Sequence, residues 1–97
     1  MFEITLTPSA FDDLYWFRMT DRRIILDGIE EQLSHQPHIV TRNRKRLRPT
    51  RVAEWELRID KFRVFYDLSI VEQWVEVKMV GHKLGNRLVV RGQEYEL

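Results

Sequence analysis

The sequence predicts an α+β fold, in which an N-terminal strand and an α-helical hairpin pack on one face of an antiparallel sheet of about four to five strands. Three stretches of hydrophobic pattern predict it. Apolar residues alternate with polar ones at the start of the chain, recur at helical spacing from residue 8 to residue 36, and alternate again from residue 55 to residue 80. Helices are thus separated from a run of consecutive strands, which is typical of α+β domains.

The first strand is predicted at residues 2–7 and leads directly into a helix. Its apolar positions are Phe2, Ile4 and Leu6. Thr7 supplies an N-cap hydroxyl and Pro8 occupies the first helical position, so together they mark the helix start. Asp12 and Asp13 follow in the first turns, where the helix dipole favours anions.

We expect the first helix to bury one apolar face with i, i+3, i+4 spacing. The residues of this face are Phe11, Leu14 and Tyr15, widened by Trp16 and Phe17. Thr20-Asp21 is the predicted N-cap of a second helix, whose pattern runs out near Gln36-Pro37. The apolar positions of the second helix are Ile25, Ile29 and Leu33. Two amphipathic helices in succession predict a hairpin.

Alternating residues after position 54 predict a meander of strands. Tight turns are expected at Asp60-Lys61 and at Arg91-Gly92, and a short further strand precedes the second turn. The residues expected to face the helices are Trp55, Leu57, Ile59, Phe62, Val64, Tyr66, Leu68, Val75, Val77 and Met79. The opposite face, expected to be uncovered, carries Glu56, Arg58, Arg63, Phe65, Lys78, Val80 and His82. A polar sheet face rimmed with arginine is a plausible platform for nucleic acid.

The composition is that of one folded domain, which we expect to cover residues 1–97. Cysteine is absent, which excludes disulfides, thiolate metal sites and cysteine nucleophiles. His35 and His38 have no partner at ligand spacing, so neither a metal nor another cofactor is expected. The first residues include acid where a signal peptide is basic and then apolar, and no apolar stretch approaches the length of a membrane span. We therefore expect a cytoplasmic protein with no membrane partner.

The most concentrated charge in the chain is a basic segment, residues 42–51. It contains six of the sixteen Lys and Arg residues and no carboxylate, and removing its six charges from the net charge of +1 leaves −5. Such a segment is typical of proteins that bind a polyanion, most often a phosphate backbone. The expected RNA-binding residues are Arg42, Arg44, Lys45, Arg46, Arg48 and Arg51.

These elements, in this order, resemble the RelE/ParE superfamily of toxins from bacterial type II toxin–antitoxin modules. The resemblance covers roughly residues 2–83. It rests on the second helix from Ile25 to Leu33, on a leucine ringed by basic residues, and on three strand motifs. In chain order, the leucine motif and the strand motifs are Lys45-Arg46-Leu47-Arg48, Trp55-Glu56-Leu57-Arg58, Phe62-Arg63-Val64-Phe65-Tyr66 and Val80-Gly81-His82-Lys83.

The resemblance implies a small toxin that a cognate antitoxin neutralises by wrapping around it. In the RelE-like branch the activity is metal-independent cleavage of mRNA on the ribosome, and this cleavage inhibits translation. In the ParE-like branch it is inhibition of DNA gyrase with no nuclease chemistry. A third alternative is a degenerate member that only binds its antitoxin. Because the basic segment favours RNA, we expect the RelE-like activity, an endoribonuclease.

The resemblance also implies the residues that carry out the chemistry. Arg63 matches the strand arginine that contacts the scissile phosphate in RelE-like nucleases, and its fixed donor fork suits a phosphate. Glu56 and Arg58 match positions that are lysines in some cleaving relatives, and Glu56 acts as a base or simply pairs with Arg58. His82 and Lys83 stand where relatives carry a residue that serves as acid or charge stabiliser.

One departure from the RelE-like pattern concerns tyrosine. Many such nucleases carry a tyrosine close behind the Gly-His motif, and here that stretch has none. Tyr95 is the only later tyrosine, and it stands between Glu94 and Glu96, a poor neighbourhood for RNA. A complete nuclease constellation is therefore not visible in the sequence. Trp16, Phe65 and Trp74 are the aromatic residues expected at the surface. They could stack on bases, but we favour contacts with the core or with an antitoxin.

Overall fold

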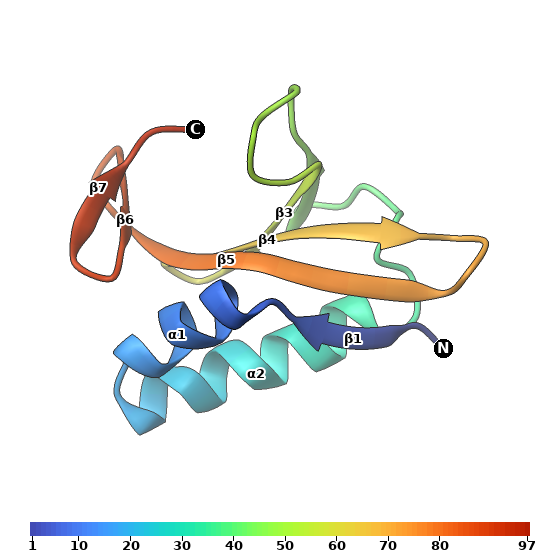
Figure 1. Cartoon of the computed structure of the whole chain (residues 1–97), viewed down its shortest axis with the longest axis horizontal. Coiled ribbons are helices and arrows are strands. Elements are labelled where there is room, and N and C mark those ends of the chain that lie inside the picture. The colour runs from blue at the N-terminus through green and yellow to red at the C-terminus, as the bar shows by residue number, and fades with distance from the viewer.

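One sheet carries both helices on the same face (Figure 1). The computed structural model describes residues 1–97. The elements are β1 (Glu3–Leu6), α1 (Pro8–Trp16), α2 (Met19–Leu33), β2 (Arg44–Arg46), β3 (Trp55–Ile59), β4 (Phe62–Ser69), β5 (Trp74–Leu84), β6 (Arg87–Val90) and β7 (Gln93–Tyr95). The predicted α+β class, the helical hairpin and its place on one face of the sheet are confirmed.

The sheet is an antiparallel meander to which one parallel strand is added. The strand order is β2-β3-β4-β5-β6-β7, and β1 pairs in parallel with β5. Because β5 is eleven residues long, one edge of it holds two partners in succession, β1 along Trp74–Val77 and β6 along His82–Leu84. Two short strands, β2 and β7, were not predicted. Residues 44–46 of the basic segment therefore form an edge strand.

The helix starts differ in how well the sequence predicts them. Thr7 caps α1 as expected, since its hydroxyl accepts a hydrogen bond of 3.1 Å from the Ala10 N–H, and Pro8 opens the helix. The predicted cap of α2 at Thr20-Asp21 is wrong, because the helix begins at Met19 and Arg18 occupies the N-cap position. The buried positions of α2 are confirmed: Ile25, Ile29 and Leu33.

The buried face of α1 is shifted from the predicted one. Phe11 and Tyr15 are half exposed, at 50% and 55%. The residues that pack inward are Ala10, Asp13, Leu14 and Phe17, which also follow helical spacing. A small residue and a carboxylate thus take the places expected for two aromatic rings. Asp13, expected as an anion near the start of the helix, is 1% exposed and packs inward.

A β-bulge in β5 reverses the faces of the residues that follow it. Phe65 pairs with Met79 while the next residue, Tyr66, pairs with Val77, which leaves Lys78 without a partner on β4. One extra residue sends every later side chain to the other face. Val80 consequently joins the core beneath the helices and Met79 does not, the reverse of the prediction.

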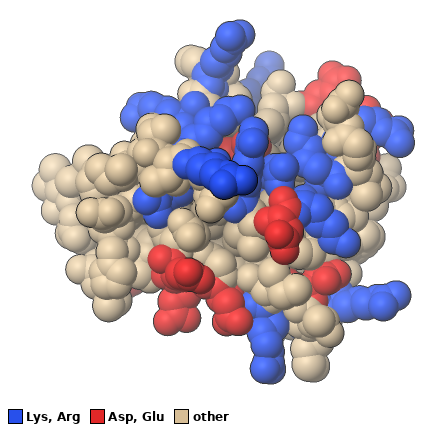
Figure 2. Space-filling model, turned by 180° about the vertical axis from the view of Figure 1, so that it is seen from behind, with Lys and Arg blue, Asp and Glu red and all other residues tan.

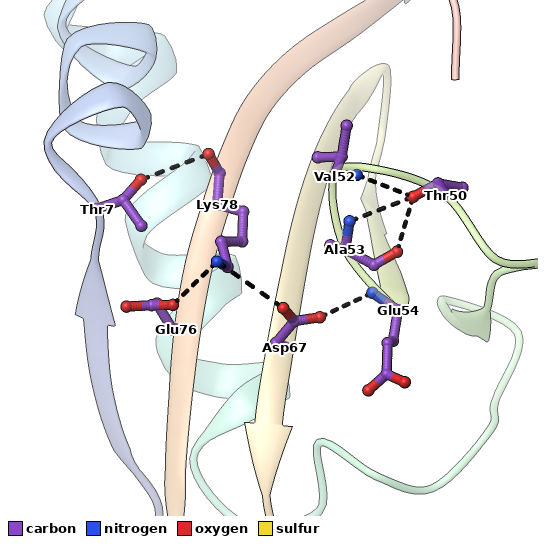
Figure 3. Close-up of polar contacts among 8 residues, drawn as sticks. All are labelled: Thr7, Thr50, Val52, Ala53, Glu54, Asp67, Glu76 and Lys78. Atoms are coloured by element: carbon purple, nitrogen blue, oxygen red, sulfur yellow. Dashed lines mark hydrogen bonds and ion pairs between the residues drawn. The ribbon is translucent and has the colours of Figure 1, made fainter.

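The sheet face away from the helices is partly covered, contrary to expectation. A second apolar cluster lies on it, made of Ala53, Phe65, Met79, Leu88 and Val90, with Leu47 and Val52 packed alongside. Phe65, expected at the surface, is fully buried. The segment between β2 and β3 folds over this face, and the Thr50 hydroxyl holds it by donating to Ala53 O and accepting from the N–H groups of Val52 and Ala53 (Figure 3). We call this side of the sheet the open face, because no helix covers it.

Candidate nucleic-acid interface

Two arginines stand side by side on the open face. Arg58 on β3 and Arg63 on β4 are direct cross-strand partners, so their side chains leave the sheet on the same face. Like charges in such a pair destabilise a sheet by a few tenths of a kcal/mol to about 1 kcal/mol. The neighbour of Arg63 on β5 is Gly81, which adds no side chain. The arrangement is therefore unfavourable for the fold alone and suited to an anion.

The guanidinium of Arg63 is only partly satisfied by the protein. Its Nη1 donates to the carbonyl oxygens of Asp60 at 2.7 Å and Phe62 at 2.9 Å, which orients the side chain along the β3–β4 turn. Its Nε is buried and has no hydrogen-bond partner. Burial lowers the pKa of Arg63 from its ordinary value, and the charge of Arg58 lowers it further, whereas Glu56 raises it. The hydrogen bonds to the turn use only Nη1, so the donors of Nη2 are left for an oxyanion.

Glu56 lies beside Arg58 on the same face of β3 and is nearly inaccessible. It is 5% exposed, and its Oε1 lies 3.5 Å from Arg58 Nε. Lys45 on β2 is its cross-strand partner. Of the two roles open to Glu56 from the sequence, this burial favours orienting Arg58 over direct contact with a substrate.

His82 is on the opposite side of the sheet from the arginines. Its ring packs edge-on against Phe17 and Trp16, with centroid separations of 5.4 and 5.7 Å, beneath the helices. The expectation that His82 shares the open face is wrong. The bulge at Lys78 inserts one extra residue into β5, so the later side chains of the strand, including His82, point to the opposite face from the one predicted. Burial lowers the pKa of His82, the charge of Lys61 lowers it further, and Asp21 raises it.

Tyr95 is a candidate site residue on the open face. The sequence disfavoured it, because Glu94 and Glu96 are its neighbours in the chain. The strand register pairs Lys83 with Leu88 and Leu88 with Tyr95, which places all three side chains in one row on the open face. Arg91 and Gly92 form the intervening turn, both with positive φ (49° and 76°), as a two-residue type I′ hairpin requires. Counting outward from such a turn would have predicted the Leu88–Tyr95 pair from the sequence.

The basic segment divides into one structural arginine and five exposed cations. Arg44 is 8% exposed and donates to Ile39 O, Gln32 O and Gln32 Oε1 at 3.0, 2.7 and 3.2 Å. It ties β2 to the end of α2 and is not available to RNA, so its prediction as an RNA-binding residue is corrected. The five exposed residues are Arg42, Lys45, Arg46, Arg48 and Arg51.

Positive charge gathers on one side of the molecule, the side turned away from the viewer in Figure 1. Figure 2 shows lysine and arginine side chains spread over the upper and central part of this side. Among the exposed cations of the segment, Arg46 is paired with Glu54 at 3.4 Å and lies over the Trp55 ring. Such exposed pairs are weak, so most of this charge remains free to meet a polyanion.

A groove of about 660 Å³ lies on the open face. Its walls are the segment between β2 and β3 on one side and the β6–β7 hairpin on the other. Residues that line it include Asp13, Arg51, Lys78, Met79, Arg91 and Tyr95. Lys78, the bulged residue, is held toward Glu76 at 3.3 Å and Asp67 at 4.0 Å, and Asp67 also accepts the Glu54 N–H (Figure 3). These contacts fix the groove's first wall to the sheet.

Two further classes of site are not found in the structure. No group of three or more His, Asp or Glu side chains is placed to hold a metal ion. None of its helices has the length and apolar character needed to cross a membrane.

Comparison with known proteins identifies the fold. No family sequence model matches the chain, and no curated protein matches it. Among solved structures, a chain of the toxin–antitoxin complex RelBE2 from Mycobacterium tuberculosis aligns over 84% of this chain and 98% of its own length, with a TM-score of 0.73 and 21% identity. The chain has the RelE fold.

Two other solved structures agree. A chain of the archaeal RelE–RelB complex from Pyrococcus horikoshii gives a TM-score of 0.59 at 13% identity, covering 81% of this chain and 91% of its own. YoeB from Staphylococcus aureus, solved as a dimer, gives 0.55 at 18% identity, covering 87% and 97%. On this RelE fold the open face carries Arg58, Arg63, Lys83 and Tyr95, with Glu56 beside Arg58, and His82 lies on the other face beneath the helices.

Proposed function

We propose that this protein is the toxin of a type II toxin–antitoxin module and that it cleaves mRNA on the ribosome. The observation that carries the proposal is the Arg58–Arg63 pair on the open face of a RelE fold. Two guanidinium groups on neighbouring strands of one sheet face supply the donors and the positive charge that a phosphate binds, which supports the proposal.

The proposed reaction needs no metal. The 2′-hydroxyl oxygen of one nucleotide attacks the adjacent phosphorus, the bond from phosphorus to the 5′ oxygen breaks, and the products are a 2′,3′-cyclic phosphate and a 5′-hydroxyl. Arg58 and Arg63 stabilise the charge that develops on the phosphoryl oxygens. Lys83 and Tyr95, the titratable side chains in the next row of the same face, transfer the protons. Glu56 orients Arg58.

The exposed cations of the basic segment have a separate role in the proposal. They bind the backbone of ribosomal RNA or of the message, which adds affinity that weakens with salt. Two of the similar structures are complexes with an antitoxin, and we propose that this chain has a cognate antitoxin as its protein partner.

Induction in growing cells tests the proposal. Wild-type protein is expected to arrest growth and to leave new 5′ ends in mRNA, mapped by primer extension, while plasmid supercoiling stays normal. Arg63→Ala is expected to abolish both the arrest and the cuts. Arg23→Ala, an exposed arginine on α2, is the matched control and should behave as wild type. Arrest that persists in Arg63→Ala would refute the proposal.

One observation favours a second function, inhibition of DNA gyrase without nuclease chemistry. His82, expected to supply an acid at the cleavage site, is not on the face that carries the arginines. If induction causes loss of supercoiling and no cuts in mRNA, this second function is the correct one. If neither occurs while an antitoxin still binds tightly, the chain is a binding member of its fold family only.

A further inference from the structure

The middle of β5 has an edge that no strand covers. On the side away from β4, β1 pairs with residues up to Val77 and β6 pairs from His82 onward. Helix α1 fills the interval. The Thr7 hydroxyl donates to Lys78 O at 3.4 Å, and the Asp13 carboxylate accepts the Val80 N–H at 3.1 Å through Oδ2. Asp13 thus takes the place of a missing strand in the hydrogen-bond ladder.

The second oxygen of the same carboxylate reaches a different element. Asp13 Oδ1 lies 2.9 Å from Nε of Arg91, the first residue of the β6–β7 turn. The side chain of Asp13 is 1% exposed and that of Arg91 is 49% exposed. The next residue of the turn, Gly92, also rests on α1, since a Cβ added there would lie 3.4 Å from the Trp16 ring. One buried carboxylate therefore links the backbone of β5 to the tip of the hairpin.

Burying a carboxylate at the uncovered edge of β5 is energetically unfavourable. Burial raises the pKa of Asp13, and the Val80 N–H and the Arg91 charge oppose that rise. An asparagine would satisfy the Val80 N–H with no charge to bury. What the charge adds is an ion pair with Arg91, since Asp13 Oδ1 lies 2.9 Å from Arg91 Nε and accepts no hydrogen bond. Arg91 is the first turn residue of the β6–β7 hairpin, and this hairpin carries Tyr95. Tyr95, Asp13 and Arg91 line the same groove.

We propose that Asp13 is a positioning residue for Tyr95: through Arg91 it fixes the β6–β7 hairpin against β5 and so holds the Tyr95 hydroxyl on the open face. The part that concerns catalysis rests on the proposed RNA cleavage. The structural part, that the Asp13–Arg91 pair sets the place of Tyr95, is independent of any activity. The two parts are tested by different readouts.

The structural test uses hydrogen exchange and NMR on the purified protein. Asp13→Asn and Arg91→Gln are expected to speed exchange of amides in residues 87–95 and to shift the Tyr95 ring resonances, with exchange in β3 and β4 unchanged. Arg91→Lys, which keeps the charge, should lie close to wild type. Asp12→Asn is the matched control, since Asp12 is the neighbouring but exposed carboxylate, and it should change neither. If Asp13→Asn does not fold, Arg91→Gln at the half-exposed partner decides alone. Unchanged exchange and an unshifted Tyr95 ring would overturn the proposal.

The catalytic test is a double-mutant comparison in the RNA-cleavage assay. Arg91→Gln is expected to lower kcat about tenfold to a hundredfold with little change in KM, because misplacing a reacting group by up to about 1 Å has effects of this size. In a Tyr95→Phe background, Arg91→Gln should cause no further loss of kcat. Equal losses in both backgrounds would show that Arg91 does not act through Tyr95. A wild-type protein that cuts no RNA would contradict the proposed function and leave the exchange result to decide the Asp13 link.

Discussion

Arg58 and Arg63 are direct cross-strand partners on β3 and β4, and one buried carboxylate, Glu56, lies 3.5 Å from Arg58 Nε. The pair is a local conflict with stability, because like charges face each other across two strands. Local conflicts of this kind are expected at functional sites, where a ligand completes the arrangement. Substitutions at these and other cationic residues can therefore separate the contribution of each residue to RNA binding from its contribution to the stability of the fold.

Arg63→Gln should leave the fold nearly as stable as wild type. The change removes two hydrogen bonds to the β3–β4 turn and also removes the repulsion from Arg58, and these effects oppose each other. We expect the free energy of unfolding, from urea denaturation, to change by less than about 1 kcal/mol. A loss of about 3 kcal/mol or more would mean that Arg63 is needed for the fold, which would undo the assignment of Arg63 to a phosphate site.

Arg44→Ala should destabilise the protein, in contrast to its neighbours in the basic segment. Its guanidinium satisfies three acceptors near the end of α2 from a nearly buried position, and the acceptors lose their partner. The expected loss is about 2–4 kcal/mol in the free energy of unfolding. Arg42→Ala, at an exposed residue two positions away, is the control and should stay within about 0.5 kcal/mol of wild type. Equal effects of the two changes would contradict the structural role of Arg44.

The charge of His82 should make the protein less stable in acid. Its pKa is lowered in the folded state by burial and by Lys61, against the opposing effect of Asp21; Arg18 is the other charged residue lining this site. The unfolded chain therefore binds the proton more readily. The stability is fully present above the ordinary histidine pKa of about 6.5 and is lost as the pH falls through the lowered pKa.

A variant isolates that contribution. In His82→Gln, the free energy of unfolding should fall less steeply between about pH 7 and pH 5 than in wild type, because the variant lacks the group whose pKa is lowered by folding. Parallel curves for the two proteins would show that His82 does not titrate differently in the folded state.

The exposed part of the basic segment should govern the salt dependence of RNA binding. Arg42, Arg48 and Arg51 are exposed and make no ion pair. Changing all three to alanine should reduce the slope of log K against log salt by about 2 for single-stranded RNA, at about 0.7 for each phosphate that the protein no longer neutralises. Arg23→Ala on α2 should leave the slope unchanged. A triple variant with the wild-type slope would place the RNA elsewhere.

The fold was predictable because its elements follow strong periodic patterns. The cap of α1 at Thr7 and the core residues of α2, β3 and β4 obey simple rules of spacing. The face of α1 did not, because hydrophobicity ranks Phe11 and Tyr15 above Ala10 and Asp13. Close packing on β5 decided otherwise: a small residue lets the helix approach, and the carboxylate completes a hydrogen-bond ladder that no sequence pattern reveals.

The candidate site was predictable in part, for a similar reason. Arg58 and Arg63 lie on either side of a tight turn, so alternation places them correctly. His82 lies beyond the bulge at Lys78. Because Met79 and Val80 are adjacent and both apolar, the sequence does not show which of them faces the core, and so it does not show the one-residue shift. Arg44 and Arg48 look alike in the sequence, and only the position of the α2 carboxyl end makes the first one structural.

The central claim is that the open face cleaves RNA by means of the arginine pair. The most direct test is a purified translating ribosome with a defined message in its decoding site, incubated with wild-type protein, Arg63→Gln or Arg23→Ala, with the 5′ ends then mapped. We predict cuts by wild type and Arg23→Ala, and a rate at least about 10²-fold lower for Arg63→Gln, with all three proteins folded. Cleavage by Arg63→Gln at the wild-type rate would contradict the claim.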